Sequence, residues 1–180
     1  VSGISVLTDS IFFGGSSEDF NIVRNNVNCP MLRKDFMIDE YQIIEAKAMG
    51  ADTVLLIAAG LEEKKCLELS ELSKSLGLEI LLEIHNEKEF HSHYNQNVTI
   101  VGVNNRNLET FEVSTAISKQ LAEVIPPEIL KISESGISHP DVVLELKKYG
   151  YQGFLMGEVF MKQPIPELAC KKFINSINKS

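Results

Sequence analysis

Short apolar runs alternate with amphipathic stretches along the whole chain, and this alternation is the feature that most constrains the fold. The runs have the length and composition of buried strands, with centres roughly 20 to 30 residues apart. They are ISVLT (4–8), CPMLR (29–33), TVLLI (53–57), EILLEI (79–84), TIVGV (99–103), EILKIS (128–133) and GFLMG (153–157). Nearly continuous apolar strands alternating with helices are typical of a parallel sheet covered by helices. We therefore predict a single α/β domain over residues 1–180 with at least seven βα units.

The predicted helices between these runs have recognisable ends. Asp39 and Asn86 each precede a helical pattern and have Gln or Glu three residues later, which is the spacing of a capping box. Pro140 stands where a first-turn proline would follow Ser138 or His139. Three of the helices are predicted to end at glycines in the left-handed conformation, namely Gly50, Gly77 and Gly150.

Two architectures fit at least seven βα units, an open doubly wound sheet and most of a (β/α)8 TIM barrel. The dinucleotide-binding fingerprint G-x-G-x-x-G does not follow any of the predicted strands. The regular spacing of the units favours the barrel. In such barrels the chemistry takes place at the carboxyl ends of the strands, so the residues at those ends are the candidates for a site.

Composition narrows the function classes. The net charge of −8 argues against nucleic acid as a partner, because binding a phosphate backbone requires a basic face. No apolar run approaches the roughly 20 residues of a membrane span, and the first residues do not resemble a signal peptide. The sequence has three cysteines, and they are widely separated. This fits a reducing cytoplasm better than a disulfide framework or a zinc site. We expect a cytoplasmic protein with no membrane partner.

Polar residues stand at the ends of the predicted strands. They are Lys34, Glu83, the NNR of 104–106, the SESG of 133–136 and the MGE of 156–158. Together they make a plausible acid–base and anion site, because a lysine and a glutamate can transfer protons and glycines let backbone N–H groups approach a ligand. Alternation along the chain places Lys34 and Phe36 on one side, towards the barrel mouth, and Arg33 and Asp35 on the other.

Each of these residues also has a plainer interpretation. A single lysine or glutamate at a strand end is more often a solvated loop residue than a catalytic group. Gly136 and Gly157 fit equally well as glycines that permit tight turns between strand and helix. Spacing alone therefore leaves both interpretations of the strand ends open.

Taken together, several stretches resemble the indole-3-glycerol phosphate synthase family. They are SVLTDSIFFGGS (5–16), LRKDFMIDEYQI (32–43), GADTVLLI (50–57), ILLEIHNEKE (80–89), VGVNNRNLETFEV (101–113), SESGI (133–137) and FLMGEVFM (154–161). The resemblance runs nearly end to end, and the RKDF and NNRNLETF motifs are specific to it. It implies a (β/α)8 barrel that closes the indole ring of 1-(2-carboxyphenylamino)-1-deoxyribulose 5-phosphate, an anionic substrate, with loss of CO2 and water. It also implies that no metal and no organic cofactor takes part.

The resemblance assigns roles to individual positions. Lys34 corresponds to the general acid at the ketone during ring closure, and Glu83 to the acid–base group of the later dehydration. The implied substrate contacts are Phe13, Phe36, Leu55, Asn104, Arg106, Glu134 and Ser135. The implied phosphate cradle consists of Ser135, Gly136, Gly157 and Glu158, with Glu158 contributing its backbone N–H.

One part of the family pattern does not match this sequence. The family has a leading helix and a first barrel strand, with a second lysine, before the stretch that corresponds to SVLTD (5–9). The chain is therefore expected to supply strands 2 to 8 of the barrel. The alternative to an active synthase is a truncated, non-catalytic barrel that at most binds a sugar phosphate. Fusion to, or association with, other enzymes of tryptophan biosynthesis is a further expectation.

Overall fold

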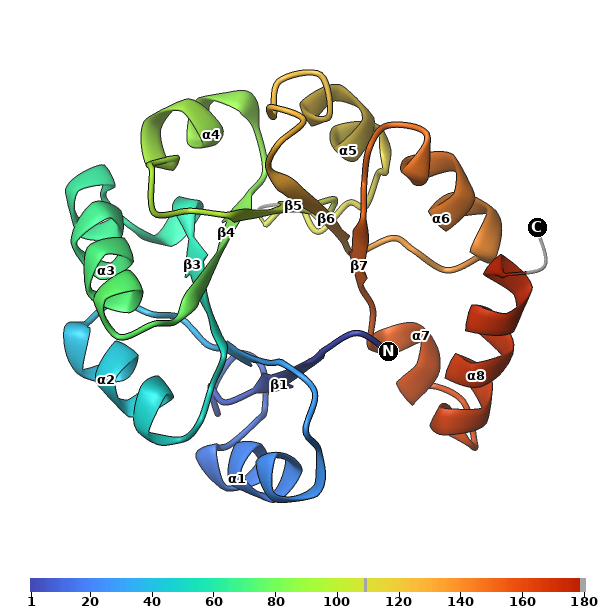
Figure 1. Cartoon of the computed structure of the whole chain (residues 1–180). Helices are drawn as coiled ribbons and strands as arrows, with labels where there is room; N and C mark the ends of the chain where they lie inside the picture. The colour runs from blue at the N-terminus through green and yellow to red at the C-terminus, as the bar shows by residue number, and fades with distance from the viewer. Residues whose placement is uncertain (109, 179–180) are drawn as a thin grey trace. The chain divides into compact units, whose positions relative to one another are not determined.

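The computed structural model describes residues 1–108 and 110–178. The chain divides into two compact units, the first made of 1–84 and 88–101 and the second of 85–87 and 102–180. Strands alternate with helices throughout (Figure 1). In chain order the elements are β1 (Ile4–Leu7), α1 (Ser17–Asn26), β2 (Met31–Lys34), α2 (Glu40–Ala48), β3 (Thr53–Ile57), the 3-10 helix η1 (Ala58–Gly60), α3 (Glu63–Ser75), β4 (Glu79–Ile84), α4 (Glu87–His93), β5 (Ile100–Asn104), α5 (Ala116–Leu121), β6 (Leu130–Glu134), α6 (Pro140–Lys147), β7 (Gly153–Leu155), α7 (Glu158–Met161) and α8 (Pro166–Ile177).

The first unit contains four parallel strands that lie in sequence order. β1 pairs with β2, β2 with β3 and β3 with β4, with Leu7 opposite Lys34 and Ile57 opposite Glu83. Helices α1, α2 and α3 all lie on the same side of these strands (Figure 1). A doubly wound sheet would reverse its strand order and cover both faces with helices. The first unit therefore has the arrangement of successive βα units in a barrel.

The second unit continues the same pattern. β6 pairs in parallel with β7, with Glu134 opposite Leu155, and α6 packs against α8. In both units parallel βα units follow one another in sequence order, so the predicted α/β fold of the TIM-barrel class is confirmed. The prediction of one domain over residues 1–180 stays a prediction.

The strands are apolar along most of their length because both of their faces are covered. Val54, Leu55 and Leu56 of β3 are all fully buried, and so are Ile80 and Leu82 of β4. Side chains that alternate between two buried faces must be apolar at every position, which explains the continuous runs in the sequence. None of the described helices combines the length and apolar character needed to cross a membrane.

Most of the predicted helix ends are confirmed. Asp39 caps α2 in a full capping box with Gln42, and His139 caps α6 directly before Pro140. Helix α4 begins at Glu87, immediately after Asn86. The three predicted terminal glycines have positive φ angles of 83°, 69° and 85°, at Gly50, Gly77 and Gly150. A glycine carries no Cβ and so adopts this conformation without steric cost.

Candidate active site

Lys34 and Glu83 form an ion pair within the first unit. Lys34 is the last residue of β2, and Glu83 lies one residue before the end of β4. Lys34 Nζ is 3.2 Å from Glu83 Oε2, and the two side chains are only 14% and 4% exposed. Taking two charges out of water is costly, so a buried ion pair is weak evidence for stability, and its residues are candidates for a site. The structure brings together two residues that are 49 positions apart in the sequence.

Aromatic rings lie beside the Lys34 ammonium. Phe13, in the loop after β1, stacks on Phe36, in the loop after β2, with ring centroids 4.7 Å apart. Lys34 Nζ lies 5.8 Å from the centroid of the Phe13 ring, which is within cation–π range. Phe12 meets Phe36 edge-on and is largely exposed. An aromatic surface next to an ion pair suits a ligand with an aromatic ring beside a polar reacting centre.

Leu55 is the third apolar contact implied by the resemblance. It lies in β3, between β2 and β4 in the sheet, and is fully buried. The structure therefore places it on the strand between the two that carry Lys34 and Glu83. Its contact with substrate stays a prediction.

A buried polar cluster fixes the backbone on either side of Lys34. Arg33 Nη2 lies 3.1 Å from Asp35 Oδ2, and Thr8 Oγ1 donates to the same oxygen over 2.6 Å. Asp35 Oδ1 accepts a hydrogen bond from the backbone N–H of Phe36, and Glu45 of α2 also pairs with Arg33 at 2.7 Å. Arg33 and Asp35 thus point to the side opposite Lys34 and Phe36, as the alternation predicted. The cluster itself was not foreseen, because charged residues beside a loop are usually solvated.

In the second unit, polar groups gather at the ends of β5 and β6 and at the start of α7. Asn104 is buried at the end of β5, and its Oδ1 accepts a hydrogen bond from the backbone N–H of Arg106 at 3.1 Å. Arg106 Nη2 lies 3.7 Å from Glu158 Oε2. The hydrogen bond from Lys162, with help from the Arg106 charge, holds the pKa of Glu158 below its ordinary value. The structure therefore brings Arg106 to Glu158 at the start of α7.

The β6 end adopts an uncommon backbone conformation. Glu134 ends the strand and is 3% exposed, while the next two residues, Ser135 and Gly136, have φ angles of 64° and 73°. A left-handed serine is unusual, because its Cβ crowds the backbone there. A Cβ added at Gly136 would come within 2.7 Å of Val113 Cγ1, so the position excludes a side chain. Gly157 differs, since it precedes α7 with a negative φ and has open space around it.

Asn105 lies within the NNR of 104–106 that the sequence singled out, but no role was predicted for it. It is fully buried, and it contacts the β6 end and α5 through five side-chain hydrogen bonds. The same alternation that places Lys34 beside Phe36 would have flagged it. Asn104 and Arg106 lie on one side of the chain, so an amide between them faces the other way and needs buried partners.

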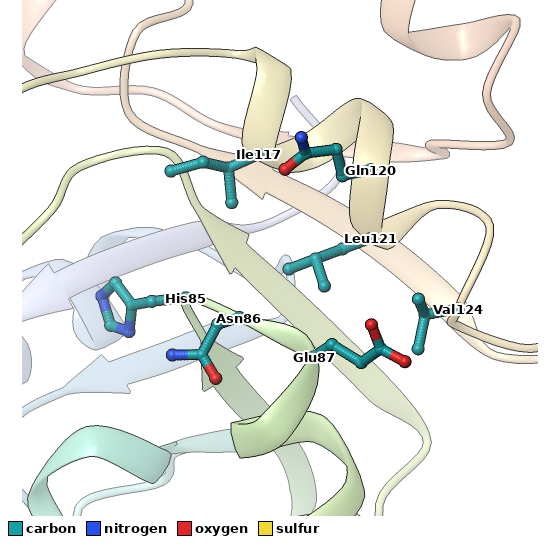
Figure 2. Close-up of a pocket in the computed structure, with 7 residues that line it drawn as sticks. All are labelled: His85, Asn86, Glu87, Ile117, Gln120, Leu121 and Val124. Carbon is teal, nitrogen blue, oxygen red and sulfur yellow. The ribbon is translucent and has the colours of Figure 1, made fainter.

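A separate pocket lies beside α5 (Figure 2). It has a volume of about 330 Å³ and is lined by His85, Asn86, Glu87, Ile117, Gln120, Leu121 and Val124. None of the predicted site residues lines it. Its described lining contains one carboxylate and no Lys or Arg, which does not suit an anionic ligand. The predicted site residues, rather than this pocket, remain the candidates for the active site.

The fold and the strand ends define the class of the protein. It is an α/β protein of the TIM-barrel class with a buried Lys–Glu ion pair at the carboxyl ends of its strands, where enzymes of this class carry their chemistry. Two solved structures share the fold at low sequence identity. A crystal structure of KGPDC from Streptococcus mutans superposes with a TM-score of 0.77 at 13% identity, covering 99% of this chain and 86% of its own. A native KDPGal structure superposes with a TM-score of 0.65 at 11% identity, covering 97% and 79%.

Within this class, the chain belongs to the indole-3-glycerol phosphate synthase family, whose model matches residues 1–173. Curated relatives that carry this name agree. The protein of Bacteroides thetaiotaomicron is 49% identical over 98% of this chain and 67% of its own length. Those of Aliarcobacter butzleri and Lachnospira eligens are 44% and 45% identical, over 98% and 94% of this chain and 67% and 65% of their lengths. The chain thus spans about two thirds of the length of these relatives.

Proposed function

We propose that the protein is an indole-3-glycerol phosphate synthase, a carboxy-lyase of tryptophan biosynthesis. Its substrate would be 1-(2-carboxyphenylamino)-1-deoxyribulose 5-phosphate, and the products would be indole-3-glycerol phosphate, CO2 and water. The observation that carries the proposal is the Lys34–Glu83 ion pair beside the stacked rings of Phe13 and Phe36. Family membership supports it. Cytoplasmic location and association with other enzymes of the pathway belong to the same proposal.

Lys34 would act first. When the substrate's aromatic ring carbon bonds to the ketone carbon, the ketone oxygen gains negative charge. An ammonium group within reach stabilises that charge and can donate a proton to the oxygen, which becomes a hydroxyl. The Lys34 ammonium is held by its 3.2 Å contact with Glu83 on one side and by the neighbouring Phe13 ring on another. These two contacts limit where the ammonium can lie, which favours one proton-donating geometry.

Glu83 would act later. Loss of CO2 regenerates an electron-rich ring, and the aromatic indole then forms by loss of a ring proton and of the new hydroxyl as water. A carboxylate that is almost fully shielded from solvent can accept that proton without competition from bulk water. The two groups of one ion pair would therefore serve successive steps.

The second unit would hold the anionic parts of the substrate. Arg106 and Asn104 carry a positive charge and an amide at the end of β5, suited to the carboxylate of the anthranilate part. The backbone at Ser135, Gly136, Gly157 and Glu158 would hold the phosphate through N–H groups. Gly157 has no atom within 4 Å of the place where a Cβ would lie, so a ligand can approach its backbone closely.

Replacing Lys34 by alanine in the full encoded protein tests the proposal. We expect indole formation, followed by fluorescence, to fall by roughly 100-fold or more, the usual contribution of a general acid. Lys64→Ala is the matched control, because Lys64 lies on α3 with a side chain that is 87% exposed, and it should retain full activity. Normal turnover in Lys34→Ala, with an unchanged melting temperature, would refute the role of Lys34.

Glu83→Gln separates the two steps in the same experiment. Single-turnover measurements should show CO2 release preceding a much slower appearance of indole, because ring closure would proceed and dehydration would not. Simultaneous loss of both products would contradict the assignment of Glu83 to the later step. A wild-type protein that forms no indole-3-glycerol phosphate at all would support the non-catalytic alternative.

A further inference from the structure

Asn105 contacts the β6 end through its amide nitrogen. Nδ2 donates to Ser133 Oγ at 2.9 Å, to the Glu134 carbonyl at 3.0 Å and to the Ser135 carbonyl at 3.1 Å. The backbone N–H of Asn105 also donates to the Glu134 carbonyl, at 2.9 Å. Asn105 thus binds two successive carbonyl groups of the segment that contains the left-handed residues.

The amide oxygen of Asn105 is held from the other side. Oδ1 accepts hydrogen bonds from the backbone N–H and the hydroxyl of Ser118, at 3.1 and 2.8 Å. Ser118 Oγ also lies 2.8 Å from Ser133 Oγ, and the backbone carbonyl of Ser118 accepts a hydrogen bond from the Tyr151 hydroxyl. Asn105, Ser118 and Ser133 are all fully buried. Since its oxygen faces only donors, the amide has a single orientation, with its nitrogen towards the β6 end.

These contacts determine the direction in which the backbone N–H groups of Ser135 and Gly136 point. The C=O and N–H of a planar trans peptide point in opposite directions, and the described residues contain no cis peptide. When Asn105 binds the carbonyls of Glu134 and Ser135, the N–H groups of Ser135 and Gly136 must point away from it. β7 pairs with β6 on the side away from β5, and its chain continues into Gly157 and Glu158. The N–H groups therefore face the strand that leads to the other half of the predicted phosphate cradle.

The same contacts account for the conformation of Ser135. A left-handed non-glycine residue costs about 1 kcal/mol or more, and it persists only when its surroundings hold it there. The carbonyl hydrogen bonds from Asn105 lie on both sides of the Ser135 Cα, at the carbonyls of residues 134 and 135. Without them, we expect the segment to relax and the two N–H groups to turn away from β7.

We propose that Asn105 is a positioning residue, which holds the Glu134–Gly136 backbone so that the N–H groups of Ser135 and Gly136 bind an anionic phosphate. The inference rests on the proposed function only for the identity of the substrate. Asn105 is fully buried, and its side chain donates to and accepts from groups of the β6 end and α5. Its effect should therefore appear in the binding of phosphate and not in the chemical steps.

The test uses inorganic phosphate as the probe, with Asn105→Ala and the isosteric Asn105→Asp. Asp keeps the size of Asn but cannot donate to the two carbonyls. Binding would be followed through the NMR amide signals of Ser135 and Gly136. We expect both variants to bind phosphate at least about tenfold more weakly, the loss of one or two hydrogen bonds to an anion. In the full encoded enzyme, KM for the phosphorylated substrate should rise by a similar factor while kcat changes little.

Two further variants separate positioning from a general effect on folding. Ser118→Ala removes a hydroxyl from the same buried network without touching the Glu134 or Ser135 carbonyls, so it should lower the melting temperature and leave phosphate affinity unchanged. Adding Ser135→Gly to Asn105→Ala should restore part of the affinity, because glycine adopts the left-handed conformation without help. Loss of stability alone would not be rescued in this way.

The outcomes are distinct. Phosphate binding at Gly136 that is weakened in Asn105→Asp and rescued by Ser135→Gly supports the inference, even if the wild-type protein forms no indole product. Unchanged phosphate affinity and KM in a folded Asn105→Ala overturns it, even if the enzyme is active. Equal losses of affinity in Ser118→Ala and Asn105→Ala, or no response of the Gly136 amide to phosphate in the wild type, overturn it as well.

Discussion

Asp35 shows how much a single residue at the strand end contributes. One of its oxygens accepts hydrogen bonds from Thr8 and pairs with Arg33, and the other accepts from the N–H of Phe36. We expect Asp35→Asn to lower the free energy of unfolding by about 3 kcal/mol. The neutral amide removes the negative charge that Asp35 places beside the buried Arg33 guanidinium. Urea unfolding of the two proteins measures the difference.

Thr8→Val is the control for that measurement. It removes the hydroxyl that donates to Asp35 and accepts from Arg33 Nε but leaves the ion pair intact, so it should cost about 1–2 kcal/mol. Asp35→Asn should also raise KM or lower kcat, because the carboxylate holds the backbone between Lys34 and Phe36. An Asp35→Asn protein as stable as Thr8→Val would show that the Arg33–Glu45 pair suffices to hold the guanidinium.

At the scale of an element, the residues that cap the start of α2 also hold a loop of the candidate site. Asp39 Oδ1 accepts from the N–H of Tyr41, and Gln42 Oε1 accepts from the N–H groups of Ile38 and Asp39. Gln42 Nε2 also donates to the carbonyl of Phe36 at 2.9 Å. The capping box therefore fixes the first turn of the helix, and Gln42 also holds the loop that carries Phe36.

Removal of this cap has a definite expected effect. Asp39→Ala should destabilise the protein by about 1 kcal/mol, because the N–H groups of the first turn lose their acceptor. Asp39→Ser should be nearly neutral, since a serine hydroxyl caps equally well. Thermal unfolding followed by circular dichroism compares the two. An Asp39→Ala melting temperature equal to that of the wild type would mean that Gln42 alone holds the helix start.

At the scale of the whole molecule, each unit contains a buried group that resists deprotonation. Burial raises the pKa of the Cys66 thiol in the first unit from 9.0 to about 11. Burial likewise raises the pKa of Tyr151 in the second unit from 10.0 to about 12. A folded-state pKa above the unfolded value means that stability is fully present below the unfolded pKa and is lost as the pH rises through the folded one. Both units should therefore lose stability in alkali.

Cys66→Ala isolates one part of this effect. In the wild type we expect the free energy of unfolding to begin falling above pH 9, with roughly 2–3 kcal/mol lost through Cys66 by pH 11. In Cys66→Ala the fall should begin about one pH unit higher, where Tyr151 starts to contribute. Burial lowers the pKa of Lys131, which acts in the opposite direction below pH 10.5 and is common to both proteins. Identical pH profiles would contradict the assignment to Cys66.

Local patterns were enough to predict the elements and the sides that their residues face. Strands buried on both faces must be apolar throughout, helix ends need particular capping residues, and alternation separates Lys34 from Arg33. For these reasons the seven strands, the capping box at Asp39 and the terminal glycines were predictable from the residues alone. The RKDF and NNRNLETF motifs then pointed to the family.

Only the tertiary structure decided which of these residues meet. A sequence shows Lys34 and Glu83 at two strand ends, but their contact depends on how β2, β3 and β4 are aligned. It shows Asn105 as one amide among several, whereas its role depends on Ser118 and the β6 end, which are distant in the chain. Backbone and side-chain periodicity act over a few residues, so the sequence by itself determined the elements and their faces. Ion pairs and buried hydrogen bonds join residues that are far apart in sequence, so the geometry of each half of the candidate site was determined only by folding.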